Sequence, residues 1–267
     1  MGKLAVENGR SIYFEDYAGA RRPVVLVHGW GMSCRTWDYN LPALREAGHR
    51  VVSLDHRGCG HSDKDFEDVS IAAIAGDVTA LINDRGLEAP VIVGWSLGAA
   101  VAVEAVEQLG DAAAGLVLIG SPSPRYLQAA DWEIGGTPEA MEETAAALRT
   151  NRAGFLHDLT LGVFKDDPGT AIIEWMWSIF METSPAADLT LIALGELDHR
   201  ELMPTLSLPA LLCVGAADVV VDPRTSAKAA ELLPNGRIVD FADSGHAPFI
   251  EEQEKFEGEL LDFLRGL

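Results

Sequence analysis

Residues 91–99 read Val91-Ile92-Val93-Gly94-Trp95-Ser96-Leu97-Gly98-Ala99, and this stretch decides how the chain folds. An apolar, β-branched run enters a Gly-x-Ser-x-Gly sequence, which opens a helix-forming run that extends to Leu109. A serine on a sharp turn between a strand and a helix has its hydroxyl raised above the sheet. This context predicts that Ser96 is a nucleophile rather than a solvated serine of a glycine-rich turn.

Short apolar runs like the one before Ser96 recur along the chain, and they are typical of strands buried on both faces of a parallel sheet. The others lie at 24–27, 50–54, 116–119, 210–214 and 237–241. Apolar residues repeat at helical spacing over 71–82 and 256–267. The Asn8-Gly9 turn predicts an antiparallel hairpin at one sheet edge. Together these patterns predict an α/β fold with a mostly parallel, doubly wound sheet.

The strand pattern is missing from residues 121–203, where aromatic residues such as Trp175 and Phe180 stand among helix formers. Sheets of this class bind their ligands at the carboxyl ends of the strands, where long connections gather. We therefore predict a helical cap, residues 121–203, inserted after the sixth strand of a core formed by 1–120 and 204–267. The alternative is that these aromatic side chains form an ordinary helical core.

A serine hydroxyl needs a general base, and the base needs an acid that orients it. In this architecture the three residues follow in the order Ser, Asp, His. His246 comes just after the last predicted strand, where a loop can reach Ser96. The other downstream histidines, His157 and His199, fall in the predicted cap. We therefore predict that His246 is the base.

Three aspartates compete for the role of the orienting acid. Asp218 follows the predicted strand 210–214 at the first turn, where a carboxylate can face the site. Asp222 precedes Pro223 and is better suited to cap the helix that begins there. Asp198 lies in the predicted cap and is the least favoured. We predict that Asp218 is the acid.

The oxyanion of acyl transfer needs preorganised N–H donors. We expect one from the backbone amide of Leu97 and the second from Trp30, in the His28-Gly29-Trp30-Gly31 loop. His28 precedes the nucleophile in the chain, so we interpret it as a residue that holds this loop. The sequence 55–62 is rich in glycine and charge, and we expect it to lock a turn rather than to bind metal or phosphate. We expect neither a metal ion nor any other cofactor.

Composition limits the partners that the chain can have. The 267 residues carry a formal charge of −21, and 48% are hydrophobic, which is enough for a large core. Nucleic acids and anionic membranes attract basic proteins, so we expect neither as a partner. The three cysteines have no disulfide or metal spacing, and no apolar run approaches the length of a membrane span. We expect a cytoplasmic monomer.

With these residues in this order, the chain resembles the α/β-hydrolase superfamily over essentially its whole length. Three local strings are most similar to the pimeloyl-[acyl-carrier protein] methyl ester carboxylesterases of biotin synthesis: 28–31, 94–98 and 246–250. The resemblance implies the α/β-hydrolase fold and a serine carboxylesterase without a cofactor. The implied substrate is a small-molecule ester or an ester carried by an acyl-carrier protein. The implied site residues are Ser96, Asp218, His246, Trp30 and Leu97.

The charge of the predicted cap opposes one of these substrates. Residues 121–203 hold five basic and 14 acidic residues. An acidic carrier protein would meet a repulsive surface there, unless basic residues cluster locally. The open alternatives are a general short-chain esterase, a lactonase, a C–C hydrolase or a perhydrolase with the same fold. A non-catalytic small-molecule binding protein on a hydrolase scaffold is the alternative from a different class.

Overall fold

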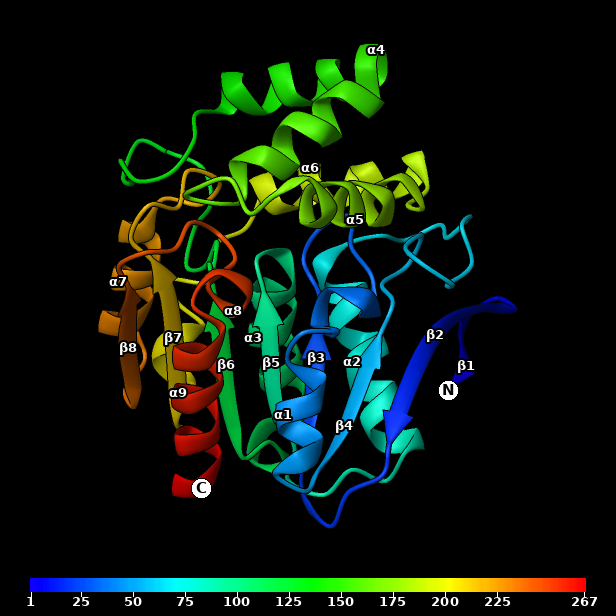
Figure 1. The fold of residues 1–267 in the computed structure, drawn as a ribbon, viewed down its shortest axis with the longest axis vertical. Coiled ribbons are helices and arrows are strands. Elements are labelled where there is room, and N and C mark those ends of the chain that lie inside the picture. The colour runs from blue at the N-terminus through cyan, green and yellow to red at the C-terminus, as the bar shows by residue number, and fades with distance from the viewer.

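An eight-stranded sheet forms the centre of the computed structural model, which describes residues 1–267 (Figure 1). The strands are β1 (Gly2–Glu7), β2 (Arg10–Tyr17), β3 (Arg21–Val27), β4 (His49–Leu54), β5 (Val91–Trp95), β6 (Gly115–Ile119), β7 (Ala210–Gly215) and β8 (Gly236–Phe241). Their order across the sheet is β1-β2-β4-β3-β5-β6-β7-β8. The N-terminal hairpin pairs antiparallel with itself and with β4, and the other neighbours are parallel. This confirms the predicted mostly parallel sheet.

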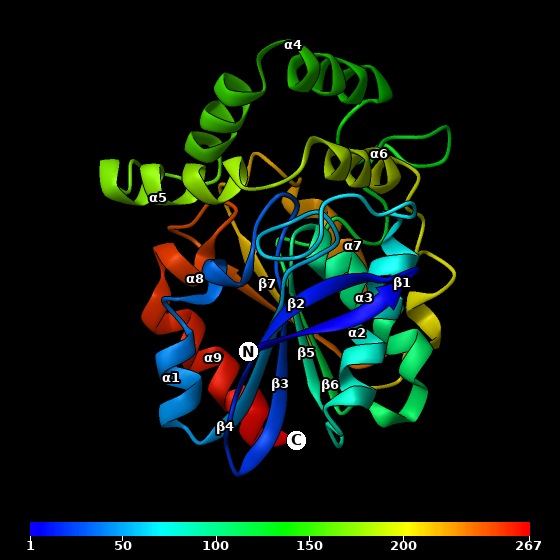
Figure 2. The same cartoon turned by 90° about the vertical axis from the view of Figure 1, so that its right-hand side faces the viewer.

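Helices cover both faces of the sheet (Figure 2). On one side lie α1 and α9, and on the other lie α2 and α3. The core helices are α1 (Leu41–Glu46), α2 (Ile71–Asp84), α3 (Leu97–Leu109), α7 (Pro223–Leu232), α8 (Pro248–Glu251) and α9 (Gln253–Gly266). The side chain of Ser70 caps α2 by accepting a hydrogen bond from the Ala73 amide, and the periodic apolar residues of α2 are buried.

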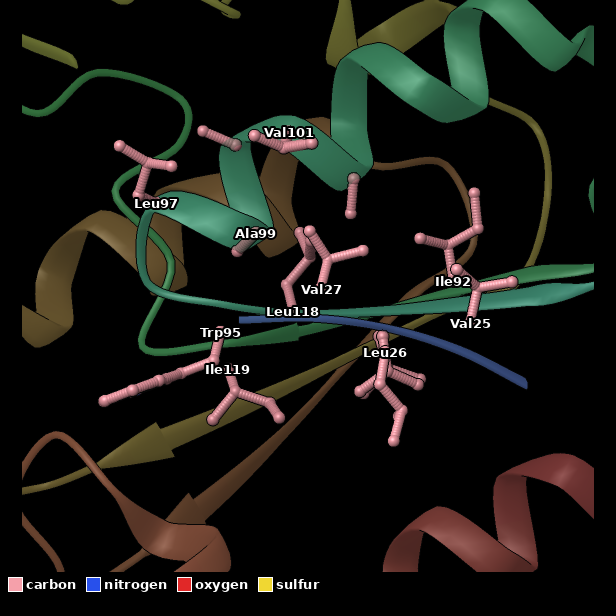
Figure 3. Close-up of a cluster of buried hydrophobic side chains, with 14 of the residues drawn as sticks. Val25, Leu26, Val27, Ile92, Trp95, Leu97, Ala99, Val101, Leu118 and Ile119 are labelled. Carbon is pink, nitrogen blue, oxygen red and sulfur yellow. The ribbon is translucent and has the colours of Figure 1, made fainter. Parts of the chain in front are cut away.

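The strands beside Ser96 are buried on both faces, as their continuous apolar sequences predict. Val91, Ile92 and Val93 have no exposed surface. Figure 3 shows the side chains of β3, β5 and β6 packing on both sides of the sheet, with those of α3 above them. This packing fixes where the carboxyl end of each strand lies, and the candidate site residues come directly after those ends.

Helices α4 (Pro138–Gly162), α5 (Thr170–Met181) and α6 (Leu189–Gly195) lie across the carboxyl ends of the parallel strands (Figure 1). They come after β6, which confirms the predicted helical cap, although its boundaries at 121 and 203 stay a prediction. Helix α4 bends at Asn151, which has non-helical dihedral angles. The short 3₁₀ helices are η1 (Cys34–Trp37), η2 (Gly110–Ala112), η3 (Pro185–Asp188) and η4 (Met203–Thr205). None of the helices has the length and apolar character needed to cross a membrane.

Candidate active site

Ser96 occupies the turn between β5 and α3, and its backbone is strained. Its φ is 55° and its ψ is −125°, a conformation that costs about 1–3 kcal/mol for a residue other than glycine. The turn is possible because Gly98 lets α3 approach the end of β3. A Cβ atom on Gly98 would lie 2.3 Å from the carbonyl oxygens of Val27 and His28. The glycine of the motif therefore sets the position of Ser96 above the sheet.

His246 and Asp218 meet at the same end of the sheet. The Nδ1 atom of His246 lies 2.7 Å from Oδ2 of Asp218, and both side chains are 2% exposed. The other carboxylate oxygen of Asp218 accepts hydrogen bonds from the amides of Val220 and Val221. These two bonds fix the carboxylate, so Oδ2 stays aimed at the imidazole. The Nε2 atom of His246 is buried and has no hydrogen-bond partner in the protein.

Trp95, which precedes Ser96, fixes the loop that carries His246. Its indole N–H donates a 2.8 Å hydrogen bond to the backbone carbonyl of His246. Its ring also packs against the imidazole, with 5.3 Å between the ring centroids. The residue before the candidate nucleophile therefore supports the residue proposed as its base.

The competing residues have other partners. Asp222 caps α7 by accepting a hydrogen bond from the Arg224 amide, and it also pairs with the Arg224 side chain. Asp198 pairs with Arg125 and Arg200. Neither aspartate is bonded to His246. The structure thus brings Asp218, and not the other two, to the histidine after the last strand.

The loop after β3 passes close to Ser96. A Cβ atom on Gly29 would lie 3.3 Å from Cβ of Ser96. The amide of Trp30 in this loop makes no hydrogen bond within the protein. Leu97 is the first residue of α3, so its amide has no intrahelical acceptor. Two unpaired backbone donors therefore lie beside the candidate nucleophile, where the oxyanion was predicted to bind.

His28 holds this loop in one orientation. Its Nε2 accepts a hydrogen bond from the His56 amide, so its Nδ1 carries the proton and donates to the carbonyl of Gly29 at 2.7 Å. The Gly29 carbonyl and the Trp30 N–H belong to one planar trans peptide and point in opposite directions. By binding the carbonyl, His28 therefore fixes the direction of the Trp30 N–H. This agrees with the structural role predicted for His28.

The His28 and His56 rings stack with 3.7 Å between their centroids, and both are buried. Burial lowers the pKa of His28 from 6.5 to about 4. Burial, together with the neighbouring His28, lowers the pKa of His56 well below its usual value. Both imidazoles are therefore neutral in the folded protein near pH 7.

This pair should make the folded state sensitive to mild acid. Below pH 6.5 the unfolded chain binds protons that the folded chain does not, so the free energy of unfolding falls as the pH falls. Between pH 6.5 and pH 5, His28 alone lowers it by about 2 kcal/mol, and His56 acts in the same direction. We expect His56→Phe to reduce this pH dependence, measured by urea unfolding at several pH values.

His157, whose side chain is half-exposed, provides the control for that measurement. His157→Gln removes a histidine outside the stacked pair, next to Trp177, and its unfolding is measured over the same pH values. Equal pH dependence in His56→Phe and the wild type would show that His56 is not held neutral.

The sequence 55–62 forms a locked turn, as expected. The two carboxylate oxygens of Asp55 accept hydrogen bonds from the amides of Cys34 and His61, each at 2.7 Å. Arg57 is buried between Asp77 and Glu7 and pairs with both. These charges satisfy one another, so they hold the turn together.

A cavity of about 360 Å³ lies between the cap and the core, and Ser96 and His246 both line it. Twelve of its 18 lining residues are hydrophobic. The cap supplies apolar groups such as Phe155, Leu159 and Phe180, and Asp158 is the acidic residue on its lining. The hydroxyl of Thr183 in the cap donates a hydrogen bond to the carbonyl of Gly31, which ties the cap to the loop after β3.

A second serine–histidine pair lies near the two ends of the predicted cap segment 121–203, and sequence reasoning gave it no role. Oγ of Ser123 lies 3.0 Å from Nδ1 of His199, whose Nε2 lies 3.3 Å from a carboxylate oxygen of Glu104. Ser123 has no exposed surface and does not line the cavity beside Ser96. His199 lies 76 positions from Ser123 and 95 positions from Glu104 in the chain, so no local motif could have indicated this cluster.

Comparison with known proteins agrees with this architecture. The family model of the alpha/beta hydrolase fold matches residues 22–253. A bifunctional esterase/perhydrolase from Acinetobacter calcoaceticus is 29% identical over the full length of both chains. The pimeloyl-[acyl-carrier protein] methyl ester esterase of Sodalis glossinidius is 30% identical over 95% of this chain and 97% of its own. An esterase from Exiguobacterium antarcticum is 25% identical and superposes with a TM-score of 0.96, covering 99% of this chain and all of the other.

Proposed function

The chain belongs to the α/β hydrolase family, and we propose that it is a serine esterase that hydrolyses small carboxylic esters through an acyl-enzyme. One observation carries this proposal. Ser96 and His246 line the same apolar cavity, and Asp218 lies 2.7 Å behind the imidazole. The similarity to esterases over the full chain supports the same reaction.

In the proposed mechanism, Nε2 of His246 takes the proton of the Ser96 hydroxyl as Oγ attacks the ester carbonyl. Asp218 holds the imidazole in the tautomer with the proton on Nδ1 and stabilises the imidazolium that forms. The Trp30 and Leu97 amides stabilise the negative oxygen of the tetrahedral intermediate. The imidazolium then protonates the leaving alcohol. A water molecule, deprotonated by His246, hydrolyses the acyl-enzyme and restores Ser96.

Ser96 is favoured over Ser123 as the nucleophile on grounds of access. A nucleophile must reach its substrate, and Ser123 is fully buried away from the cavity. The hydrogen bond between Ser123 and His199 satisfies two buried polar groups that would otherwise be costly. We therefore assign that pair to the attachment of the cap and Ser96 to the chemistry.

The cavity supports an uncharged substrate of modest size. A volume of about 360 Å³ is near the lower end for ligand sites, and its lining is mostly apolar. No lysine or arginine lines it, so an anionic group inside it would lack a charge partner. We propose short alkyl and aryl esters as the substrate class.

The similarity to the pimeloyl-[acyl-carrier protein] methyl ester esterase supports a methyl ester as one such substrate. The charges on the cap do not favour its protein carrier, because most basic residues there already pair with acids. These pairs are Arg125–Asp198, Arg152–Asp188, Lys165–Asp243 and Arg200–Asp131. Arg149 makes no such pair, and one unpaired cation is a weak site for an acidic protein. We propose that the carrier protein contributes little to recognition.

A panel of p-nitrophenyl esters tests the proposed activity. We expect hydrolysis of acetyl to hexanoyl esters and slower hydrolysis of longer chains, because the cavity is small. A fluorophosphonate should block the activity and, by peptide mass spectrometry, label Ser96. An absence of hydrolysis across the panel, or labelling of Ser123 instead, would contradict the proposal.

Two further assays refine the substrate. A methyl pimeloyl thioester presented as a small molecule and on acyl-carrier protein should be hydrolysed at similar kcat/KM, and a large preference for the carrier would contradict the weak-docking proposal. Replacing water by hydrogen peroxide tests perhydrolysis of the acyl-enzyme, a reaction that the similarity to the bifunctional esterase/perhydrolase supports.

A further inference from the structure

The loop that carries His246 is attached to the end of a cap helix. The amide of His246 donates a 2.7 Å hydrogen bond to the carbonyl of Val163, which directly follows α4. Gly245 allows this approach, since a Cβ atom there would lie 2.7 Å from the same carbonyl and 2.8 Å from the Lys165 amide. Val163 and His246 both line the cavity, so this attachment lies directly behind its wall.

The carboxylate of Glu251 bridges the same two segments. One oxygen accepts the Lys165 amide at 2.7 Å and the other accepts the Gly245 amide at 2.8 Å. Glu251 is the last residue of α8, so this bridge is anchored in the core. Burial raises the pKa of Glu251, and the nearby Asp218 adds to this effect. A partly buried carboxylate is thus used to hold two backbone amides, one on the cap side and one beside the proposed base.

We propose that Glu251 is a positioning residue that couples the contact between the core and residues 163–165, which follow α4 of the cap, to the position of His246. This inference rests on the proposed esterase function only for its effect on the rate. When residues 163–165 are in contact with the core, the Glu251 carboxylate binds the Gly245 amide, and the Val163 carbonyl binds the His246 amide. If residues 163–165 move away, the loop that carries His246 loses its link through Glu251 and its hydrogen bond to Val163. The imidazole is then no longer held in one position relative to Ser96.

Glu251→Gln tests the coupling with a side chain of the same shape. The amide keeps one oxygen acceptor, but its NH₂ group faces the second backbone N–H, so one of the two hydrogen bonds is replaced by two opposed donors. Misplacing a catalytic group by about 1 Å can cost about 100-fold. We expect kcat for p-nitrophenyl butyrate to fall by about 10- to 100-fold with KM within about twofold of the wild type.

Glu252 provides the matched control. Its carboxylate accepts hydrogen bonds from the Asp243 amide and the Ser244 hydroxyl, so it supports the same loop without touching the cap. Glu252→Gln should keep kcat within a small factor of the wild type. An equal fall in kcat for the two variants would show that the loop is generally sensitive and would overturn the coupling to the cap.

Hydrogen exchange gives a readout that does not depend on ester hydrolysis. In Glu251→Gln, the amides of 163–165 and of 245–246 should exchange faster together, with unchanged exchange in the sheet. Unchanged exchange in either segment, or a kcat within about twofold of the wild type, would overturn the proposal. If the wild-type protein hydrolyses no ester, the proposed function fails, and the exchange result still decides the coupling.

Discussion

Ser96→Ala should lower kcat for p-nitrophenyl butyrate by about 10⁴-fold or more, because it removes the hydroxyl that is proposed to form the acyl-enzyme. The fold should be retained. The turn at Ser96 is held by backbone contacts, such as the 2.8 Å hydrogen bond from its amide to the carbonyl of Ile119, and these do not need the hydroxyl. Initial rates, with circular dichroism and a thermal melt on the same sample, measure both parts of this expectation.

Ser123→Ala is the matched control, because Ser123 is a second serine near the site and is hydrogen-bonded to the histidine His199. It leaves Nδ1 of His199 buried without its partner, which costs about 1–3 kcal/mol of stability. The ester hydrolysis rate of the folded variant should stay near that of the wild type. The reverse outcome, with loss of activity in Ser123→Ala and not in Ser96→Ala, would assign the chemistry to Ser123 and His199.

The strands and the turn at Ser96 could be predicted because their signals are local. A continuous apolar run such as Val91–Val93 reports burial on both faces whatever the rest of the chain does. The glycines around Ser96 indicate a tight turn for the same reason. The signal that distinguishes Asp218 from Asp222 is also local, since Pro223 identifies Asp222 as the N-cap of a helix. These features depend on neighbours in the sequence, which are visible without a structure.

The contacts that tie the cap to the core could not be predicted in the same way. Glu251 bonds to Lys165 across 86 positions, and Ser123 bonds to His199 across 76. The contact between Glu251 and Lys165 depends on where α4 ends over the sheet, and α4 is bent at Asn151. A glutamate five residues after His246, or a histidine in the cap, has no local pattern that reveals its partner. The sequence therefore predicted the candidate triad but not its attachment to the cap.

Asp218→Asn should lower kcat by about 10⁴-fold while the protein stays folded. The geometry of Asp218 gives the reason. Its Oδ1 accepts the amides of Val220 and Val221, so the asparagine oxygen must stay on that side. Its NH₂ group then faces Nδ1 of His246 and donates to it. The imidazole is forced to carry its proton on Nε2, and it can no longer accept the proton of Ser96.

Asp222→Asn isolates this effect from a loss of charge in the same loop. Asparagine caps a helix as well as aspartate does, and the exposed pair with Arg224 contributes little, so stability should change by less than about 1 kcal/mol. Its kcat should equal that of the wild type. Because the two variants remove the same charge four positions apart, only the tautomer argument predicts that they differ. Similar rates in the two variants would mean that the carboxylate of Asp218 does not orient the base.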